Sequence, residues 1–131
     1  MSYDGRVVSL RGAQLRPQPV QQPRPPIWIG GSGPKRTLPL VARYADVWHT
    51  WGTPTSLAEA NARIDDLAAE AGRDPASIVR ASSLSLDDLD TARRHAARWR
   101  DAGYGYLVCG WPGAGRSQVE AFARDVMPEL T

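Results

Sequence analysis

The sequence predicts an α/β fold of four consecutive βα units, with a parallel sheet and its helices on the outside. Short segments that look like strands occur four times, and the first of them is an apolar run with prolines before it and glycines behind it. A segment with apolar residues at helical spacing follows each of the four. The chain has 131 residues, about half of the ~250 residues that a (β/α)8 TIM barrel needs. The sequence therefore predicts one half of such a barrel.

The first unit begins with the sequence Pro-Pro-Ile-Trp-Ile at residues 25–29. Its apolar part, residues 27–29, is too short for a helix, and we expect a fully buried strand there. A glycine-rich turn follows, made of Gly30, Gly31, Ser32 and Gly33, which we call the 30–33 turn. Pro34 has a fixed φ that suits the first position of a helix, so the helix is predicted over residues 35–44.

The second unit begins with a strand over residues 46–50. Ser56 and Glu59 have the spacing of a capping box, in which each side chain bonds the free backbone amide of the other. We therefore expect a helix to begin there. Its apolar residues lie on one face, and Gly72 is expected to end it.

The third and fourth units repeat this order. A strand over residues 78–86 is followed by a helix that Asp87 or Asp88 is expected to cap. A strand over residues 104–110 is followed by the last helix. That helix begins with a second predicted capping box at residues 117–120.

Residues 1–24 differ from the rest because they show no sustained periodicity. Residues 6–11 could form one short strand. Residues 17–26 are expected to be extended, because their prolines forbid a helix and bias the preceding residues to extended geometry. The predicted organisation is an extended or irregular leader over residues 1–24 and a half-barrel over residues 25–131.

The composition excludes several classes of protein. The formal net charge is only +2, and the arginines are scattered among acidic residues, so no nucleic-acid partner is predicted. No apolar run approaches the ~20 residues of a membrane span, and no signal peptide opens the chain, so we expect a cytoplasmic protein with no membrane partner. The single Cys109 excludes an internal disulfide, and two histidines without suitable partners predict no catalytic metal.

The motif Pro-Pro-Ile-Trp-Ile-Gly-Gly-Ser-Gly-x-Lys-Arg-Thr-Leu, followed by Val-Ala-Arg-Tyr-Ala-Asp, resembles a signature of the luciferase-like monooxygenase family. Residues 3–6 and 15–21 are similar to the segment that precedes this strand in the family. The resemblance implies a flavin- or deazaflavin-dependent oxidoreductase whose barrel has its last four units here. It implies FMN or 8-hydroxy-5-deazaflavin (coenzyme F-420) as the cofactor, together with a small-molecule substrate that the sequence does not name.

The 30–33 turn is the candidate cofactor site. Free backbone N–H groups at the start of a helix favour a negative charge, and glycine lets a bulky anion approach the backbone. The resemblance assigns the cofactor phosphate to the amides of Gly30, Gly31, Ser32 and Gly33, and Lys35 or Arg36 could add a charge-assisted contact. The alternative is a plain connection between a strand and a helix. No catalytic residue is assigned.

Three further features could belong to a site at the strand ends. His49 could transfer a proton, or it could be a partly buried, hydrogen-bonded histidine; the resembling family has Asp-Gly-Trp-Asn where this chain has Asp-Val-Trp-His at residues 46–49. The glycine-rich loop over residues 110–116 is a second candidate anion site. Trp48, Trp51 and Trp111 lie at strand ends, where they could pack in the barrel or form a wall of a flavin site.

Two other residues are expected to have no role in the chemistry. Cys109 lies in an apolar strand and is predicted to be a buried, inert thiol. Asp46 directly precedes the second strand, at the end opposite the chemistry, and is expected to be structural.

Three functions are compatible with these features: a luciferase-like oxidoreductase, a non-catalytic half-barrel remnant, or one half of a split enzyme. Half a barrel leaves two strand edges unpaired and one face of the sheet uncovered. We therefore expect either a homodimer or a complex with a complementary N-terminal half.

Overall fold

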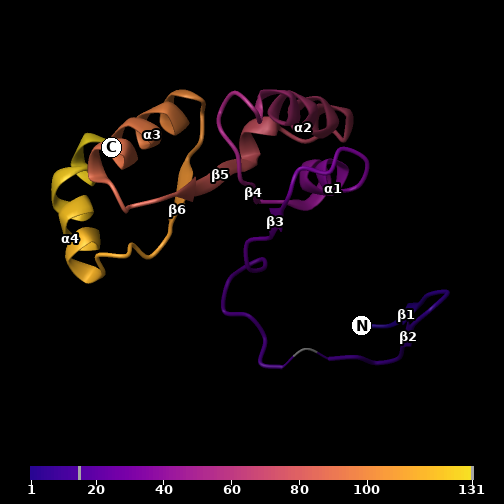
Figure 1. Cartoon of the computed structure of the whole chain (residues 1–131). Helices are drawn as coiled ribbons and strands as arrows, with labels where there is room; N and C mark the ends of the chain where they lie inside the picture. Colours follow the sequence, from indigo (N-terminus) through magenta and orange to yellow (C-terminus); the bar gives the residue numbers. More distant parts are fainter. Residues whose placement is uncertain (15, 131) are drawn as a thin grey trace.

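The computed structural model describes residues 1–14 and 16–130, and it contains the four predicted βα units (Figure 1). The parallel strands lie in sequence order, β3-β4-β5-β6. They are β3 (Trp28–Gly30), β4 (Val47–His49), β5 (Val79–Leu84) and β6 (Tyr106–Cys109). The helices that follow them are α1 (Thr37–Tyr44), α2 (Ala58–Glu70), α3 (Leu89–Asp101) and α4 (Arg116–Asp125). The prediction of an α/β half-barrel is confirmed.

The sheet is strongly curved. Trp28 on β3 and Tyr106 on β6 belong to opposite edges, yet their ring centroids lie 5.1 Å apart in an edge-to-face arrangement. In a flat sheet, three strand spacings of ~4.8 Å would separate the edge strands by roughly 14 Å. The two rings meet because the sheet bends as the wall of a barrel does, and they lie on its concave face.

The concave face is open in this chain. Four of its apolar side chains are exposed, Trp28 by 45%, Val79 by 40%, Tyr106 by 50% and Val108 by 41%, whereas Val47 and Ala81 between them are buried. The prediction that residues 27–29 are fully buried is therefore wrong. Ile29 packs against the core beneath the helices, whereas Trp28 faces the side that no described part of the chain covers, and Ile27 is also exposed.

The convex face carries the core, which has two main parts and a smaller third cluster of Leu57, Trp99 and Tyr104. The first part packs β3 and β4 against α1 and α2, and the fully buried Trp48 is its largest side chain. The second part packs β5 and β6 against α3 and α4 through Leu84, Ala96 and Phe122, with Leu107 at its edge. No helix among the described residues is long and apolar enough to cross a membrane.

Both predicted capping boxes are wrong. Ser56 Oγ accepts a hydrogen bond from the Thr53 amide at 2.9 Å, and α2 begins at Ala58 without a side-chain cap. Ser117 Oγ donates to the Ala114 carbonyl at 3.2 Å, and α4 begins one residue earlier, at Arg116. Both serines form local bonds within their loops, and such bonds compete with capping.

Two other predicted helix ends are confirmed. Asp88 caps α3, because its carboxylate accepts a hydrogen bond from the Thr91 amide at 2.7 Å. Gly72 follows α2 with a φ of +69°, and the Arg73 amide donates to the Ala68 carbonyl. This left-handed turn closes a helix and favours glycine.

The leader extends away from the half-barrel (Figure 1). Where one strand was expected over residues 6–11, two short antiparallel strands form instead, β1 (Tyr3–Asp4) and β2 (Ser9–Leu10). Leu15, which is part of the family-like leader motif, lies outside the described residues, as does Thr131. The boundary between residues 1–24 and 25–131 stays a prediction.

Asp46 joins the leader to the sheet. Its carboxylate pairs with Arg24 and accepts a hydrogen bond from the Ile27 amide at 2.6 Å. The Arg24 and Ile27 hydrogen bonds lower the pKa of Asp46 from 3.8 to about 2. Asp46 lies at the amino end of β4, away from the loops that follow the strands, so it has a structural place.

We expect Asp46→Asn to lower the free energy of unfolding at pH 7. A carboxyl group whose pKa is depressed in the folded state stabilises that state above its unfolded pKa, and the effect disappears as the pH falls through its folded pKa. The difference between the parent and Asp46→Asn should therefore shrink between pH 3.8 and pH about 2. Urea denaturation at several pH values measures it. A difference that is the same at pH 7 and pH 2 would contradict this account.

Candidate functional site

The carboxyl ends of the four parallel strands meet at one edge of the sheet, and the 30–33 turn lies at this edge after β3. Two residues of β4 hold the backbone of Gly31 through hydrogen bonds. Trp48 Nε1 donates to the Gly31 carbonyl at 2.7 Å, and the Gly31 amide donates to the His49 carbonyl at 3.0 Å. Gly31 has a φ of +99°, which residues other than glycine rarely adopt. The turn is therefore positioned by the sheet beneath it.

The backbone N–H groups of the two residues after Gly31 are available to an acceptor from outside the protein. Ser32 and Gly33 are exposed, and within the described residues their N–H groups have no protein acceptor. A Cβ added to Gly33 would lie 3.1 Å from Thr37 Oγ1, closer than most such contacts. Free amides in a close-fitting turn of this kind can bind an anion.

The helix after the turn starts later than predicted. Residues 34–36 form a turn, and α1 begins at Thr37, because the amides of Thr37 and Leu38 both donate to the Gly33 carbonyl. Its first turn has no acidic residue, and Lys35 and Arg36 are exposed beside it. The start of α1 itself therefore carries positive charge, which favours an anion.

A cavity of about 550 Å³ opens between the 30–33 turn and α2. Ser32, Leu57 and Arg63 line it, together with the carboxylates of Glu59 and Asp66. Its charge is mixed, and Ser32 is the residue of the 30–33 turn that lines it.

His49 points into the concave face. Its Nε2 lies 3.1 Å from Ser83 Oγ, and its ring meets the Trp51 ring edge to face with centroids 5.7 Å apart. It is therefore a partly buried, hydrogen-bonded histidine at the carboxyl end of a strand, and the same position leaves it open to a proton-transfer role. The sequence analysis did not select Ser83, although its place in the predicted strand over residues 78–86, near the carboxyl end, was the available signal.

The second glycine-rich loop is a poor anion site, which corrects that prediction. The Gly113 amide donates to Asp87 Oδ1 at 2.9 Å, so a carboxylate of the protein already occupies this loop. The bond from Gly113, with a second from Ser85, lowers the pKa of Asp87, which therefore stays negative and would repel an anion.

The tryptophans near the strand ends divide into two groups. Trp48 is fully buried on the convex face and forms no wall of a site, contrary to one alternative. Trp51 and Trp111 are 77% and 75% exposed, and both line a cavity of about 430 Å³ with Ser83, Asp87 and Val108. We call this cavity the indole pocket.

Cys109 differs from its prediction. It is exposed at the outer edge of β6 because no strand pairs with that edge. Partial desolvation raises the pKa of its thiol, which lowers the share of reactive thiolate.

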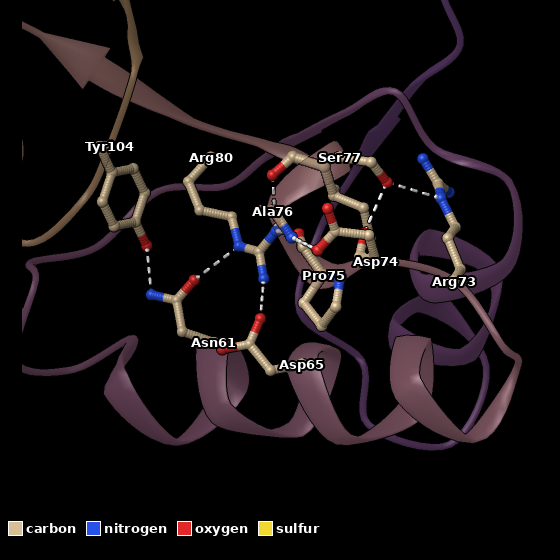
Figure 2. Close-up of polar contacts among 10 residues, drawn as sticks. Asn61, Asp65, Arg73, Asp74, Pro75, Ala76, Ser77, Arg80 and Tyr104 are labelled. Carbon is tan, nitrogen blue, oxygen red and sulfur yellow. Dashed lines mark hydrogen bonds and ion pairs between the residues drawn. The ribbon is translucent and has the colours of Figure 1, made fainter.

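The densest polar network lies at the other end of the sheet (Figure 2). Arg80 donates to Asn61 and Asp65 of α2 and to the carbonyls of Pro75 and Ile78. Tyr104 bonds the Asn61 amide group at 3.0 Å. A cavity of about 1050 Å³ lies beside this network, but its arginine already uses its donors within the protein. At this end of a barrel such contacts stabilise the fold.

The fold thus defines the chain as one half of a (β/α)8 barrel. The family model for luciferase-like monooxygenases matches residues 1–126. The chain therefore belongs to the luciferase-like monooxygenase family.

Solved structures share the fold. One is an F420-dependent secondary alcohol dehydrogenase in complex with an F420-acetone adduct, 18% identical with a TM-score of 0.81, matched over 100% of this chain and 56% of that chain. Another is the coenzyme F420 dependent tetrahydromethanopterin reductase from Methanopyrus kandleri, 15% identical with a TM-score of 0.78, matched over 99% of this chain and 58% of that one. This chain spans a little more than half the length of these two proteins.

Proposed function

We propose that this chain is the cofactor-anchoring half of a flavin- or deazaflavin-dependent oxidoreductase, and that its 30–33 turn binds the phosphate of FMN or coenzyme F-420. The observation that carries the proposal is the pair of exposed, unpartnered amides at Ser32 and Gly33, next to a helix start with positive charge. The two solved neighbours whose names include coenzyme F420 support the deazaflavin alternative.

In this proposal the chain's own residues bind and orient. The Ser32 and Gly33 amides hold the phosphate, Gly31 supplies the backbone turn, and Lys35 or Arg36 adds a charge-assisted contact. The bound flavin or deazaflavin supplies the redox chemistry. His49, at the end of the neighbouring strand, is the group of this chain that is placed to hold or move a proton at its Nε2.

We further propose that a complementary polypeptide covers the concave face. Apolar surface is exposed along the inside of the sheet at Trp28, Val79, Tyr106 and Val108, and no strand among the described residues pairs with either edge of this sheet. Parallel sheets are normally covered on both faces. A complementary N-terminal half or a second copy of the chain would supply the missing strands and cover these side chains.

The phosphate proposal predicts that Ser32→Asp weakens cofactor binding by about tenfold or more. A carboxylate within a few ångströms of the phosphate costs ~1–4 kcal/mol, depending on how far water screens it. Ser32 is exposed, and no described residue other than glycine has a positive φ, so the backbone tolerates the change. Equilibrium titration with FMN and with coenzyme F-420, followed by absorbance or fluorescence, measures the affinity.

Ser32→Asn is the matched control, because it has nearly the same shape as Ser32→Asp without the charge. We expect it to bind either cofactor within about threefold of the parent. Equal affinities for Ser32→Asp and Ser32→Asn would place the phosphate elsewhere.

A further inference from the structure

The indole pocket has the size and position of a small-molecule site. Its volume of about 430 Å³ falls within the ~300–1,000 Å³ of most ligand pockets. It lies where the chain leaves β4, β5 and β6, at the end of a barrel that carries active sites. Trp51 and Trp111 present most of their ring surface to water there, which is unfavourable unless something covers the rings.

Two polar features point at the kind of ligand. Ser83 Oγ is paired with His49 Nε2, and a hydroxyl can form more than one hydrogen bond, so the pair can also receive a hydroxyl or a carbonyl of a ligand. Asp87 also lines the pocket and is held as a carboxylate by Gly113 and Ser85. A negative group at the rim disfavours an anionic ligand.

We propose that the indole pocket is the substrate subsite, and that it takes a neutral, planar ring bearing a hydroxyl or carbonyl group. The ring packs against Trp51 and Trp111, and its oxygen bonds the Ser83 hydroxyl, which His49 Nε2 holds in place. This inference rests on the proposed function only in calling the ligand a substrate. The edge-to-face contact with His49 orients the Trp51 ring, so that His49 is a positioning residue for the pocket as well as a hydrogen-bonding partner.

The rest of the exposed aromatic surface is different in kind. Trp28 lies on the concave face and packs on Tyr106 from the opposite edge. It lines none of the cavities that contain the 30–33 turn or the indole pocket. Trp28 is therefore a surface for another polypeptide, whereas Trp51 and Trp111 line a cavity with converging polar groups. This contrast makes Trp28 an internal control.

The test uses 2-naphthol, which is neutral and planar and carries one hydroxyl. It is titrated into the full 131-residue chain labelled with ¹⁵N. The signals of the tryptophan indole N–H groups are followed and assigned by single Trp→Phe variants. We expect the Trp51 and Trp111 signals to shift in a saturable way, while those of Trp28 and the buried Trp48 stay in place. Decahydro-2-naphthol has the same carbon skeleton without planarity and should bind at least fivefold more weakly.

Variants locate the binding. We expect Trp51→Ala and Trp111→Ala each to weaken 2-naphthol binding by roughly tenfold. Trp28→Ala should leave it unchanged. Absence of saturable shifts, equal shifts at Trp28, or equal affinity for the two probes would overturn the inference. The inference would also be overturned if the Trp51 and Trp111 signals shifted with the protein concentration and not with the concentration of 2-naphthol. A second copy of the chain would then cover the indole pocket.

A final arm separates this inference from the proposed function. 2-Naphthol should still bind when FMN or coenzyme F-420 is saturating, and it should still bind to Ser32→Asp. Loss of 2-naphthol binding under saturating cofactor would overturn the inference, because the pocket would then hold the cofactor ring. If 2-naphthol binds as expected but neither cofactor binds, the proposed function fails and the pocket assignment stands.

Discussion

Trp48→Ala is expected to lower the free energy of unfolding by about 3–5 kcal/mol, the range for removing a large buried aromatic side chain. Trp48 is fully buried and packs with residues of α1 and α2, and its indole also bonds the Gly31 carbonyl. Small domains are stable by only ~5–15 kcal/mol, so the variant would lose a large part of its stability. Urea denaturation followed by far-ultraviolet circular dichroism measures this change.

Two variants control for this effect. Trp111→Ala removes an exposed ring and should change the stability by less than about 0.5 kcal/mol. Trp48→Phe keeps an aromatic ring but removes the bond to Gly31, and it should cost about 1–2 kcal/mol while also loosening the 30–33 turn. A loss below about 1 kcal/mol for Trp48→Ala would show that this tryptophan does not hold the core and the turn together.

The second large effect concerns turnover. We expect the 131-residue chain by itself to show no multiple-turnover oxidation or reduction of FMN or coenzyme F-420 above the rate of the free cofactor. Positioning the reacting groups contributes ~7–11 kcal/mol to catalysis, and these four βα units supply only four of the eight strand ends of a barrel. Absorbance of the cofactor over many equivalents is the measurement.

Co-expression with the first four βα units of a full-length member of the family is the complementary arm. We expect a one-to-one complex by sedimentation and a blue shift of the fluorescence of Trp28 as the concave face is covered. For the chain without this partner, we expect a dimer at micromolar concentration. Steady turnover by the chain alone, or a stable 14.3 kDa monomer that ignores the added half, would contradict the open-barrel account.

The order of strands and helices could be predicted because it depends on local patterns. Short strand-like segments, each followed by apolar residues at helical spacing, marked all four βα units. The two capping boxes were wrong because Ser56 and Ser117 have other hydrogen-bond partners within three residues. Sequence spacing alone does not distinguish between these partners.

The candidate site was less predictable because its contacts join distant residues. His49 meets Ser83 across 34 residues, and Gly113 meets Asp87 across 26 residues. Only the parallel register of the strands brings these groups together. The exposure of Trp28 could not be predicted from the sequence either. A short apolar strand is normally buried, and the sequence does not show that one face of this sheet is uncovered.

The most direct test of the central claim follows the backbone amides of the 30–33 turn in a ¹⁵N-labelled chain during titration with FMN and with coenzyme F-420. If the turn holds the phosphate, the amide signals of Ser32 and Gly33 should shift more than those of any other loop, and inorganic phosphate should shift the same two signals more weakly. The Gly113 amide, which already donates to Asp87, should stay in place. Saturable binding with unmoved Ser32 and Gly33 signals would contradict the account.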